Sequence, residues 1–281
     1  MEQMRADWDA LFAAPVDAHV EDVVANGVPC QWIAASGARA DRVIVYLHGG
    51  GYQVGSLVSH SELMARLSAA AAVRVLGVGY RLAPEHPYPA PLDDSLVVLA
   101  WLRGQGYLAQ EVALAGDSAG GGLALSVLLA LQLAGQAPPA AAFTMSAWTD
   151  LTAGGESYEA RAALDPINQR PMLVAMARNY LGNIAATEPL ASPLHASAAQ
   201  MQKLPPLLLQ VGERETVVSD SELFARKAAA AGASAQLEIW PEMFHVFQQF
   251  PELPEAREAV AAGGRFLAAH LSAASSRKNS S

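Results

Sequence analysis

The feature that most constrains the fold of this chain is a regular alternation of short apolar runs with longer stretches of helical periodicity. The strands that this pattern predicts lie at residues 42–47, 73–80, 111–115, 141–145, 206–211 and 236–240. The helices predicted between and after them lie at residues 59–72, 92–103, 119–134, 220–231 and 254–270. The strand runs are almost continuously apolar, which is typical of strands buried on both faces. The pattern therefore predicts an α/β fold, with a mostly parallel sheet flanked by helices on both faces.

One segment breaks this alternation. Residues 149–203 lie between two predicted strands and are too long for a usual crossover, and they contain a helical pattern of their own at 171–181. We interpret this segment as an insertion above the C-terminal edge of the sheet. Apolar residues at helical spacing near the start of the chain predict a short helix there. The chain is thus predicted to be a single domain, residues 1–281, with a small helical cap formed by about residues 1–20 and the insertion at about 149–203.

Composition excludes several classes of protein. The chain has 18 basic and 27 acidic side chains, a net charge of -9, so it has no basic surplus for binding nucleic acid. Apolar residues make up 52% and charged residues 16%, which argues against disorder. We expect no membrane span, because no apolar stretch reaches the roughly 18 residues that one needs. The single cysteine, Cys30, excludes an intramolecular disulfide, and the start of the chain shows no secretory signal pattern, so we expect a cytoplasmic location.

The strongest candidate for chemistry is the sequence Gly-Asp-Ser-Ala-Gly at residues 116–120, where a predicted strand meets a predicted helix. A turn this sharp forces a strained backbone on Ser118, and side chains at positions 116 and 120 would collide across it. The Ser118 hydroxyl is then exposed above the sheet near a helix N-terminus. The context favours a nucleophilic serine over the alternative, a glycine-rich helix start with a capping serine.

A second candidate is His-Gly-Gly-Gly at residues 48–51, directly after the strand at 42–47. Consecutive glycines allow backbone N–H groups to approach a ligand atom closely, which an oxyanion hole requires. A flexible turn is one alternative. A phosphate-binding loop is another, and it is less favoured because neither G-x-x-x-x-G-K-[ST] nor G-x-G-x-x-G occurs in the chain. We expect His48 to hold the loop rather than to act as a base.

A serine nucleophile needs a base, and the base needs an acid that orients it. His245 stands directly after the last predicted strand, in the kind of loop where a parallel sheet places its ligands. The alternative for this residue is a packed loop histidine among aromatic side chains. The acid candidates follow the strand at 206–211 and are Glu213, Glu215 and Asp220. Asp220 also has the position of a helix cap, and the residues alone leave the choice open.

Together these residues resemble the α/β-hydrolase fold and, more narrowly, the bacterial hormone-sensitive-lipase-like esterases. Four motifs occur in the family's order. They are HGGGY at 48–52, YRLAPEHPYPA at 80–90, GDSAGG at 116–121 and His-Val-Phe at 245–247. The resemblance covers about residues 40–270. It implies a twisted sheet of about eight strands with a small helical cap.

The resemblance also implies roles for individual residues. Ser118 would be the nucleophile and His245 the base. The oxyanion hole would be formed by the backbone N–H groups of Gly50, Gly51 and Ala119. Neither a metal nor an organic cofactor is implied.

The acid follows from spacing within the family, whose acid precedes the histidine by about the interval found here. Glu215 stands 30 residues before His245, and it is therefore selected. Most members of the family have aspartate at this position, so Glu215 departs from the commoner pattern. Asp220 stays the fallback.

The implied activity is that of a carboxylesterase that hydrolyses short- to medium-chain acyl esters through a Ser118 acyl-enzyme. The same residues could act on lactones, thioesters, carbamates or acetylated small molecules, and the sequence does not separate these substrates. A non-catalytic ligand-binding scaffold is the least favoured reading. Plant hormone receptors that resemble this family have lost the histidine, whereas His245 is present here.

Two further expectations concern the substrate pocket and the assembly. Four aromatic residues, Tyr52, Trp148, Tyr180 and Phe244, are expected to bind substrate. The last strand, near residues 236–240, is expected at the edge of the sheet, where it could pair with a second copy of the chain. Members of the family often dimerise there, so a homodimer is expected.

Overall fold

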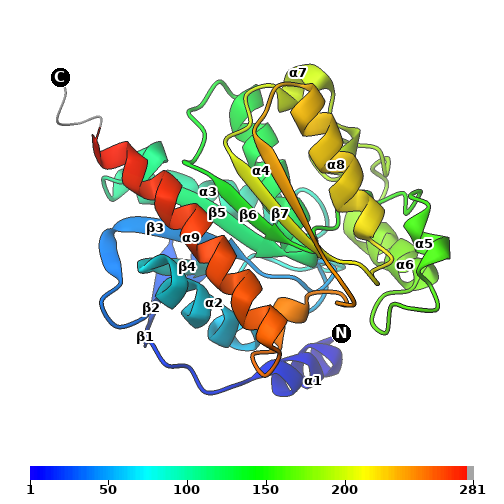
Figure 1. The fold of residues 1–281 in the computed structure, drawn as a ribbon, viewed down its shortest axis with the longest axis horizontal. Coiled ribbons are helices and arrows are strands. Elements are labelled where there is room, and N and C mark those ends of the chain that lie inside the picture. The colour runs from blue at the N-terminus through cyan, green and yellow to red at the C-terminus, as the bar shows by residue number, and fades with distance from the viewer. Residues whose placement is uncertain (277–281) are drawn as a thin grey trace.

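The sheet at the centre of the chain contains all of the predicted strands (Figure 1). The computed structural model describes residues 1–276. Its strands are β1 (His19–Ala25), β2 (Val28–Ala34), β3 (Arg39–Leu47), β4 (Val73–Val78), β5 (Val112–Asp117), β6 (Ala142–Met145), β7 (Leu207–Gly212) and β8 (Ala235–Trp240). They form one sheet in the order β1-β2-β4-β3-β5-β6-β7-β8, in which β2 pairs antiparallel with β1 and β4 and the other pairs are parallel. The expected α/β fold with a mostly parallel sheet is confirmed.

Helices cover both faces of this sheet. They are α1 (Glu2–Phe12), α2 (Leu57–Ala71), α3 (Ala90–Gly104), α4 (Ser118–Leu133), α5 (Ser157–Ala160), α6 (Arg170–Leu181), α7 (Ala198–Met201), α8 (Val218–Ala230) and α9 (Pro254–Ser276). Helices α2 and α9 lie against one face, as Figure 1 shows, and α3, α4 and α8 pack on the other. Strand β3 shows why both faces are apolar. Val43 and Val45 point into the core under α4, whereas Ile44 and Tyr46 point toward α2, because successive strand residues face opposite sides.

The antiparallel hairpin β1–β2 at one edge of the sheet was not predicted from the sequence. Most residues of β1 are exposed, so this strand lacks the continuous apolar run that marks the central strands. A signal was nevertheless present, because the hairpin turns at Asn26 and Gly27, both with positive φ. Asn-Gly is the dipeptide preferred in two-residue hairpin turns. Within about residues 1–20, where the N-terminal part of the cap is expected, α1 covers Glu2–Phe12 and β1 begins at His19.

The segment between β6 and β7 contains α5, α6 and α7, and its main helix, α6, lies close to the predicted 171–181. Figure 1 shows α5 and α6 side by side at one end of the sheet. At the other extreme of the sheet order, β8 is an edge strand, as expected.

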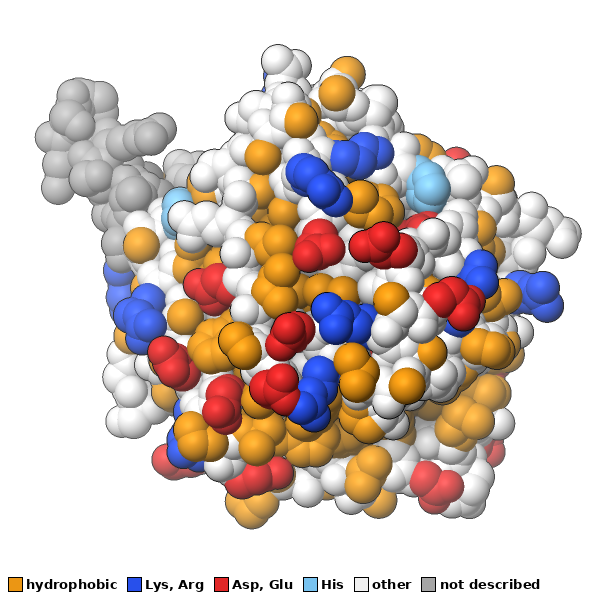
Figure 2. All heavy atoms as spheres, turned by 45° about the vertical axis from the view of Figure 1, so that its right-hand side comes forward, with side chains coloured by type: hydrophobic (Ala, Val, Ile, Leu, Met, Phe, Trp, Pro, Cys, Tyr) orange, Lys and Arg blue, Asp and Glu red, His pale blue; other side chains and the backbone are white. Residues whose placement is uncertain are grey.

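The surface and the helices give two further results. On the face shown in Figure 2, acidic and basic side chains are interspersed, and they do not gather into one continuous basic patch. Within residues 1–276, no helix combines the length and the hydropathy that crossing a membrane requires.

Candidate active site

Ser118 lies at the turn from β5 into α4, and its backbone has the strained conformation expected there, with φ of 49°. The two flanking glycines are required by close contacts. A Cβ atom on Gly116 would stand 2.5 Å from the carbonyl oxygen of Gly120, and one on Gly120 would overlap the carbonyl oxygen of Leu47. Only glycine fits at both positions. The turn therefore holds Ser118 at the N-terminus of α4 with its side chain on a cavity.

Three side chains from separate loops form one hydrogen-bonded chain. The Ser118 hydroxyl lies 2.8 Å from Nε2 of His245, and Nδ1 of His245 lies 2.8 Å from Oε2 of Glu215. Glu215 is fully buried, and its other oxygen, Oε1, accepts hydrogen bonds from the Ser146 hydroxyl at 2.6 Å and from the Gly212 N–H at 2.5 Å. The carboxylate is thereby fixed on both oxygens. The structure thus brings together the three residues that the resemblance selected.

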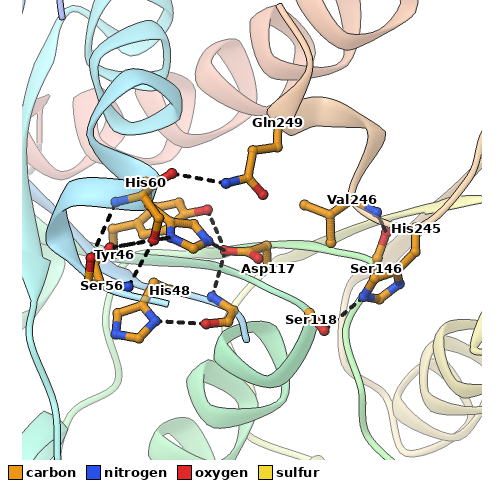
Figure 3. A network of polar contacts seen from close by, with 12 residues as sticks. Tyr46, His48, Ser56, His60, Asp117, Ser118, Ser146, His245, Val246 and Gln249 are labelled. Atoms are coloured by element: carbon orange, nitrogen blue, oxygen red, sulfur yellow. Dashed lines mark hydrogen bonds and ion pairs between the residues drawn. The ribbon is translucent and has the colours of Figure 1, made fainter. Parts of the chain in front are cut away.

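Ser146 also connects the loop of the base to that of the acid. Its hydroxyl donates to Glu215 and accepts from the N–H of Val246 at 3.0 Å, as Figure 3 shows for the contact with Val246. The loop that carries His245 is therefore tied to the end of β6. The sequence analysis did not single out Ser146, because nothing in its local pattern distinguishes it from an ordinary strand end.

The environment of His245 favours its protonated form. Burial of the ring lowers its pKa, but the negative charge of Glu215 and the hydrogen bond to it outweigh burial, so the pKa of His245 lies above its ordinary value. An imidazole held in this way can accept a proton from Ser118 and keep the resulting charge beside a carboxylate. This is the arrangement of a nucleophile, a base and an orienting acid.

The other two acid candidates lie away from His245. Oδ2 of Asp220 accepts hydrogen bonds from the N–H groups of Thr149 and Asp150, each at 2.8 Å, and so anchors the turn after β6. Burial and the charge of Asp150 raise the pKa of Asp220 to about 8. Glu213 accepts from the N–H of Glu242 at 3.1 Å near the surface.

The glycine loop after β3 has the expected open donors. Gly50 and Gly51 have φ of 109° and 60°, and a Cβ atom on Gly50 would overlap the carbonyl oxygen of Val54. Among the described residues, neither the Gly50 nor the Gly51 N–H has a hydrogen-bond partner. The Ala119 N–H lies in the first turn of α4, where helix N–H groups lack an intrahelical acceptor. Because Gly50 and Gly51 line the same cavity as Ser118, this edge can stabilise negative charge.

A buried polar network holds this loop from behind, and Figure 3 shows it. Oδ1 of Asp117 accepts hydrogen bonds from the Gly49 N–H at 3.0 Å and from the Tyr46 hydroxyl at 2.7 Å, and Nε2 of His60 lies 3.4 Å away. Burial alone would raise the pKa of Asp117, but His60 and the hydrogen bonds from His60 and Tyr46 outweigh it, so its pKa lies below the usual value. The sequence analysis missed this role of Asp117, although its place beside Ser118 in the motif was a signal.

His48 lies under the glycine loop, in the kind of position that its expected structural role requires. Its ring stacks on that of Tyr80, with centroids 4.3 Å apart, and its Nδ1 donates to the Gly49 carbonyl oxygen at 2.8 Å. Burial and the neighbouring His60 lower the pKa of His48 to about 4. The ring is therefore neutral at pH 7 and does not contact Ser118.

The cavity above Ser118 has a volume of about 130 Å³. Its walls come from α1, the glycine loop, α6 with the loop before it, and the segment after His245. The lining residues are Trp8, Phe12, Gly50, Gly51, Val54, Asp117, Ser118, Ile167, Asn168, Met172, Leu173, Met176, His245, Val246, Gln249 and Phe250. A larger and more open hollow, beside Trp32 and Arg74 on the β1–β2 side, contains none of these residues.

The four aromatic residues predicted to bind substrate do not line this cavity, and that prediction is corrected. Tyr52 and Tyr180 stack on each other with ring centroids 3.7 Å apart, next to Trp148 in the buried core. Phe244 packs edge-on against Phe250, which is the residue that reaches the cavity. Aromatic character alone could not distinguish a wall of the cavity from the core beneath it.

Among the described residues, no cluster of three or more His, Cys, Asp or Glu side chains is arranged to hold a metal ion. The cavity is lined by Ser118 and His245 of the hydrogen-bonded chain, by Gly50 and Gly51 of the glycine loop and by mostly apolar walls. Such a set is suited to acyl transfer through a serine.

Comparison with known proteins shows which family the chain resembles. A family model described as alpha/beta hydrolase fold matches residues 44–249. The chain is 42% identical over 249 residues to an acetyl-hydrolase of Streptomyces hygroscopicus, covering 88% of this chain and 82% of that protein. It is 34% identical to an esterase of Acinetobacter venetianus, covering 89% of this chain and 82% of that protein.

Solved structures of other proteins are also similar to this chain. An esterase from the bacterial hormone-sensitive lipase (HSL) family has 43% identity and a TM-score of 0.93, and the match covers 96% of this chain and 91% of that one. An esterase/lipase from an uncultured bacterium has 39% identity and a TM-score of 0.92, with the same coverage. The chain therefore belongs to the alpha/beta hydrolase fold family, and within it to the bacterial hormone-sensitive lipase (HSL) group.

Proposed function

We propose that the protein is a carboxylesterase that uses Ser118 as nucleophile, His245 as base and Glu215 as orienting acid. The observation that carries the proposal is the unbroken hydrogen-bonded chain from Ser118 to Glu215 beside the open N–H groups of the glycine loop. Membership in a family that contains esterases supports it.

The reaction has two stages. His245 accepts the Ser118 proton as the hydroxyl oxygen attacks the ester carbonyl carbon, and the carbonyl oxygen becomes an oxyanion facing the N–H groups of Gly50, Gly51 and Ala119. The tetrahedral intermediate collapses as His245 protonates the departing alcohol. Water then attacks the acyl-enzyme in the same way and releases the carboxylic acid.

The size of the cavity supports short acyl groups. A volume of about 130 Å³ with apolar walls suits acyl chains of a few carbons and leaves no room for a long fatty chain. We propose that the cap consists of α1, which contributes Trp8 and Phe12, and the insertion at 149–203, which contributes Ile167 and Met172.

A second candidate is removal of an acetyl group from a larger small molecule. The small cavity favours it, as does the 42% identity to a protein named acetyl-hydrolase. Comparing an acetylated small molecule with its butyryl analogue would separate the two, because only the second candidate requires a strong preference for acetyl.

The proposed function is tested with p-nitrophenyl butyrate. Ser118→Ala should lower kcat by at least about 10⁴-fold, because no other group at this position can form the acyl-enzyme. Ser126→Ala is the matched control, since Ser126 lies buried in the same helix, away from the cavity, and should keep its activity. An Ser118→Ala protein that retains most of its activity would contradict the assignment.

We also propose that the protein forms the expected homodimer. Among residues 1–276, no strand lies beside the outer side of β8, and Ile239 of this strand is 41% exposed. A free edge with an exposed apolar side chain can pair with the same edge of a second copy.

The cytoplasmic location stays a prediction that cell fractionation would test.

A further inference from the structure

The loop that carries Glu215 is held from one side by the insertion at 149–203. Thr216 directly follows Glu215 and is fully buried. Its N–H and its hydroxyl both donate to Oδ2 of Asp165, at 2.8 Å and 3.0 Å. Its carbonyl oxygen accepts a hydrogen bond from the Ser157 hydroxyl at 2.5 Å. Asp165 and Ser157 both belong to the insertion, so this segment binds the N–H, the hydroxyl and the carbonyl group of Thr216.

The other oxygen of the Asp165 carboxylate holds a wall of the cavity. Oδ1 accepts hydrogen bonds from the N–H groups of Ile167 at 2.9 Å and Asn168 at 3.0 Å. Both of these residues line the cavity above Ser118. Aspartate side chains often close turns in this way, by bonding to N–H groups a few residues ahead. A single carboxylate, which is 4% exposed, therefore connects the wall of the cavity to the residue after the acid.

The loop is also fixed on the side before the acid. The N–H of Arg214 donates to the carbonyl oxygen of Met243 at 3.0 Å. Glu215 thus lies between one attachment to the loop of the base and another to the insertion. Its carboxylate must stay in contact with His245 while the ring gains and loses a proton, and a misplacement of about 1 Å can cost about 100-fold in rate. The attachment of Thr216 to Asp165 is therefore placed to affect the reaction.

Asp165 also acts on the base through its charge. Burial of the His245 ring lowers its pKa, and the negative charges of Glu215, Asp165 and Asp117 outweigh this effect, with Glu215 contributing most. These carboxylates come from three different segments, namely the loop after β7, the insertion and the end of β5. Removing the charge of Asp165 should therefore lower the pKa of His245. Removing a neutral group that contacts Asp165 leaves these charges in place.

We propose that Asp165 is a positioning residue of the reaction, which holds the loop of Glu215 through Thr216 and joins this loop to the wall of the cavity. The inference rests on the proposed function and adds a residue of the insertion to the groups that orient the acid. Asp165 acts through Glu215 and His245. Because the acid acts on the imidazolium that forms during the reaction, the effect of Asp165 belongs mainly to kcat rather than to KM.

The first variant, Asp165→Asn, keeps the side-chain volume but removes the charge and places an NH₂ group against N–H donors. With p-nitrophenyl butyrate, kcat should fall about 10- to 100-fold, because a charge-assisted hydrogen bond to the loop of the acid is lost. KM should change by less than about threefold. The rise of kcat/KM with pH should occur at lower pH than in the wild type, because one of the charges that raise the pKa of His245 is gone.

The second variant, Thr216→Val, tests the attachment without changing any charge. It removes the hydroxyl that donates to Asp165 and keeps both the N–H and the side-chain volume. We expect kcat to fall about three- to tenfold, with the pH profile of the wild type. Thr216→Ser restores the hydroxyl and should recover most of the wild-type kcat. These two variants test the proposal even if Asp165→Asn does not fold.

Two control variants remove carboxylates elsewhere. Glu159→Gln removes a carboxylate from the same insertion, where it forms an exposed ion pair with Arg170. Asp94→Asn removes a buried carboxylate that pairs with Arg81 away from the cavity. Both should keep the wild-type kcat and pH profile. Titration of Ser118 with diethyl p-nitrophenyl phosphate gives the concentration of active protein, so that kcat refers to folded molecules in every variant.

The outcomes separate the positioning role from the proposed function. If the wild-type protein hydrolyses p-nitrophenyl butyrate and Thr216→Val keeps kcat within about twofold, the positioning role is refuted and the proposed function stands. A fall in kcat of Asp165→Asn that is matched by a rise in KM, at an unchanged pH profile, also refutes it, because Asp165 then only shapes the cavity. If the wild-type protein hydrolyses no ester, the proposed function fails and the positioning role fails with it.

Discussion

Ser118, His245 and Glu215 show at the scale of single residues how distant positions form one site. Ser118 and His245 are 127 positions apart and Glu215 and His245 are 30 apart, yet both contacts are 2.8 Å long. Each residue follows the C-terminal end of a parallel strand, and parallel strands end at the same edge of the sheet. This is why positions after strand ends pointed to Ser118 and His245, whereas Glu215 was selected among three acids by the resemblance to the family.

The first prediction tests the acid. Glu215→Gln should lower kcat/KM by about 10³- to 10⁴-fold, because a neutral amide no longer stabilises the imidazolium or holds its tautomer. The carboxylate raises the pKa of His245, so in the wild type kcat/KM should rise with pH through a value above the ordinary 6.5. In Glu215→Gln, the rise of kcat/KM with pH should occur at lower pH. A pH profile of p-nitrophenyl butyrate hydrolysis measures both effects, and an unshifted rise would contradict the assignment.

The second prediction concerns Asp220, whose carboxyl has a raised pKa in the folded protein. Its pKa is about 8 in the folded protein and about 3.9 in the unfolded chain, so the folded state binds more protons between these values. The free energy of unfolding contributed by Asp220 therefore falls as pH rises from about 4 to about 8. Asp220→Asn removes this titration and should be stabilising relative to the wild type at pH 8 but not at pH 4. Thermal unfolding at pH 4 and pH 8 measures the difference in stability between the two proteins. As a control, Asp220→Asn should keep an activity near that of the wild type.

The third prediction concerns Asp117 as a positioning residue. Its bond to the Gly49 N–H orients the glycine loop, whose N–H groups act on charge that exists only in the transition state. Asp117→Asn should lower kcat by about 10- to 100-fold with little change in KM.

A trifluoromethyl ketone forms an oxyanion with the serine. Comparing its binding with that of the substrate therefore distinguishes a loss of oxyanion stabilisation from a general loss of structure. Its affinity should fall in Asp117→Asn in parallel with kcat, whereas binding of the substrate should not. Asp94→Asn is the control, because Asp94 is also buried but pairs with Arg81 away from the cavity. A rise in KM as large as the fall in kcat would argue against a role of Asp117 that is confined to the glycine loop.

At the scale of elements, helix α1 and helix α6 close the cavity from two distant parts of the sequence. Met176 of α6 contacts Gly51 so closely that a Cβ atom there would overlap the methionine sulfur. Phe12 of α1 packs against Phe250 with ring centroids 6.1 Å apart. The size of the cavity is therefore decided by how these elements dock.

The fourth prediction tests the docking of α1. Arg5 binds the carbonyl oxygens of Gln53 and Ala83 and forms an ion pair with Glu85. Arg5→Ala should loosen α1, raise KM for butyrate esters about threefold or more, and raise the relative rate on longer acyl chains, because Trp8 and Phe12 then restrict the cavity less. A series of p-nitrophenyl esters from acetate to octanoate measures this. Arg39→Ala, which removes an exposed ion pair with Asp41, should keep the wild-type profile.

The elements differ in how far their sequences predicted them. The central strands carry continuous apolar runs because both of their faces are covered, and β5, β6 and β7 are fully buried. Strand β1 is mostly exposed, and its local sequence carries little of that signal. The turn at Asn26 and Gly27 was the remaining clue to the hairpin.

At the scale of the whole molecule, the open edge at β8 is the feature that concerns assembly. The other edge, at β1, belongs to a hairpin that is packed beside α3. Pairing of the β8 edge across a twofold axis would extend the sheet without a change in fold.

The fifth prediction tests the proposed dimer. Ile239→Lys places a positive charge on the β8 edge, so two copies would repel each other across the twofold axis, and the dimer should dissociate to monomer. Sedimentation velocity at micromolar concentration measures the change. Leu133→Lys, at an exposed position at the end of α4, should not alter the sedimentation coefficient. A wild-type protein that sediments as a monomer would contradict the proposal.

Together with the resemblance to the family, the sequence selected the residues of the hydrogen-bonded chain. By itself it determined the α/β fold and the turn at Ser118. These depend on local rules: continuous apolar runs mark buried strands, and Gly116 and Gly120 permit a turn that no other residue could make. Only the tertiary structure decided which apolar side chains line the cavity. Trp8 and Tyr52 are both aromatic, but one faces the cavity and the other is buried in the core, because contacts between distant elements set the walls.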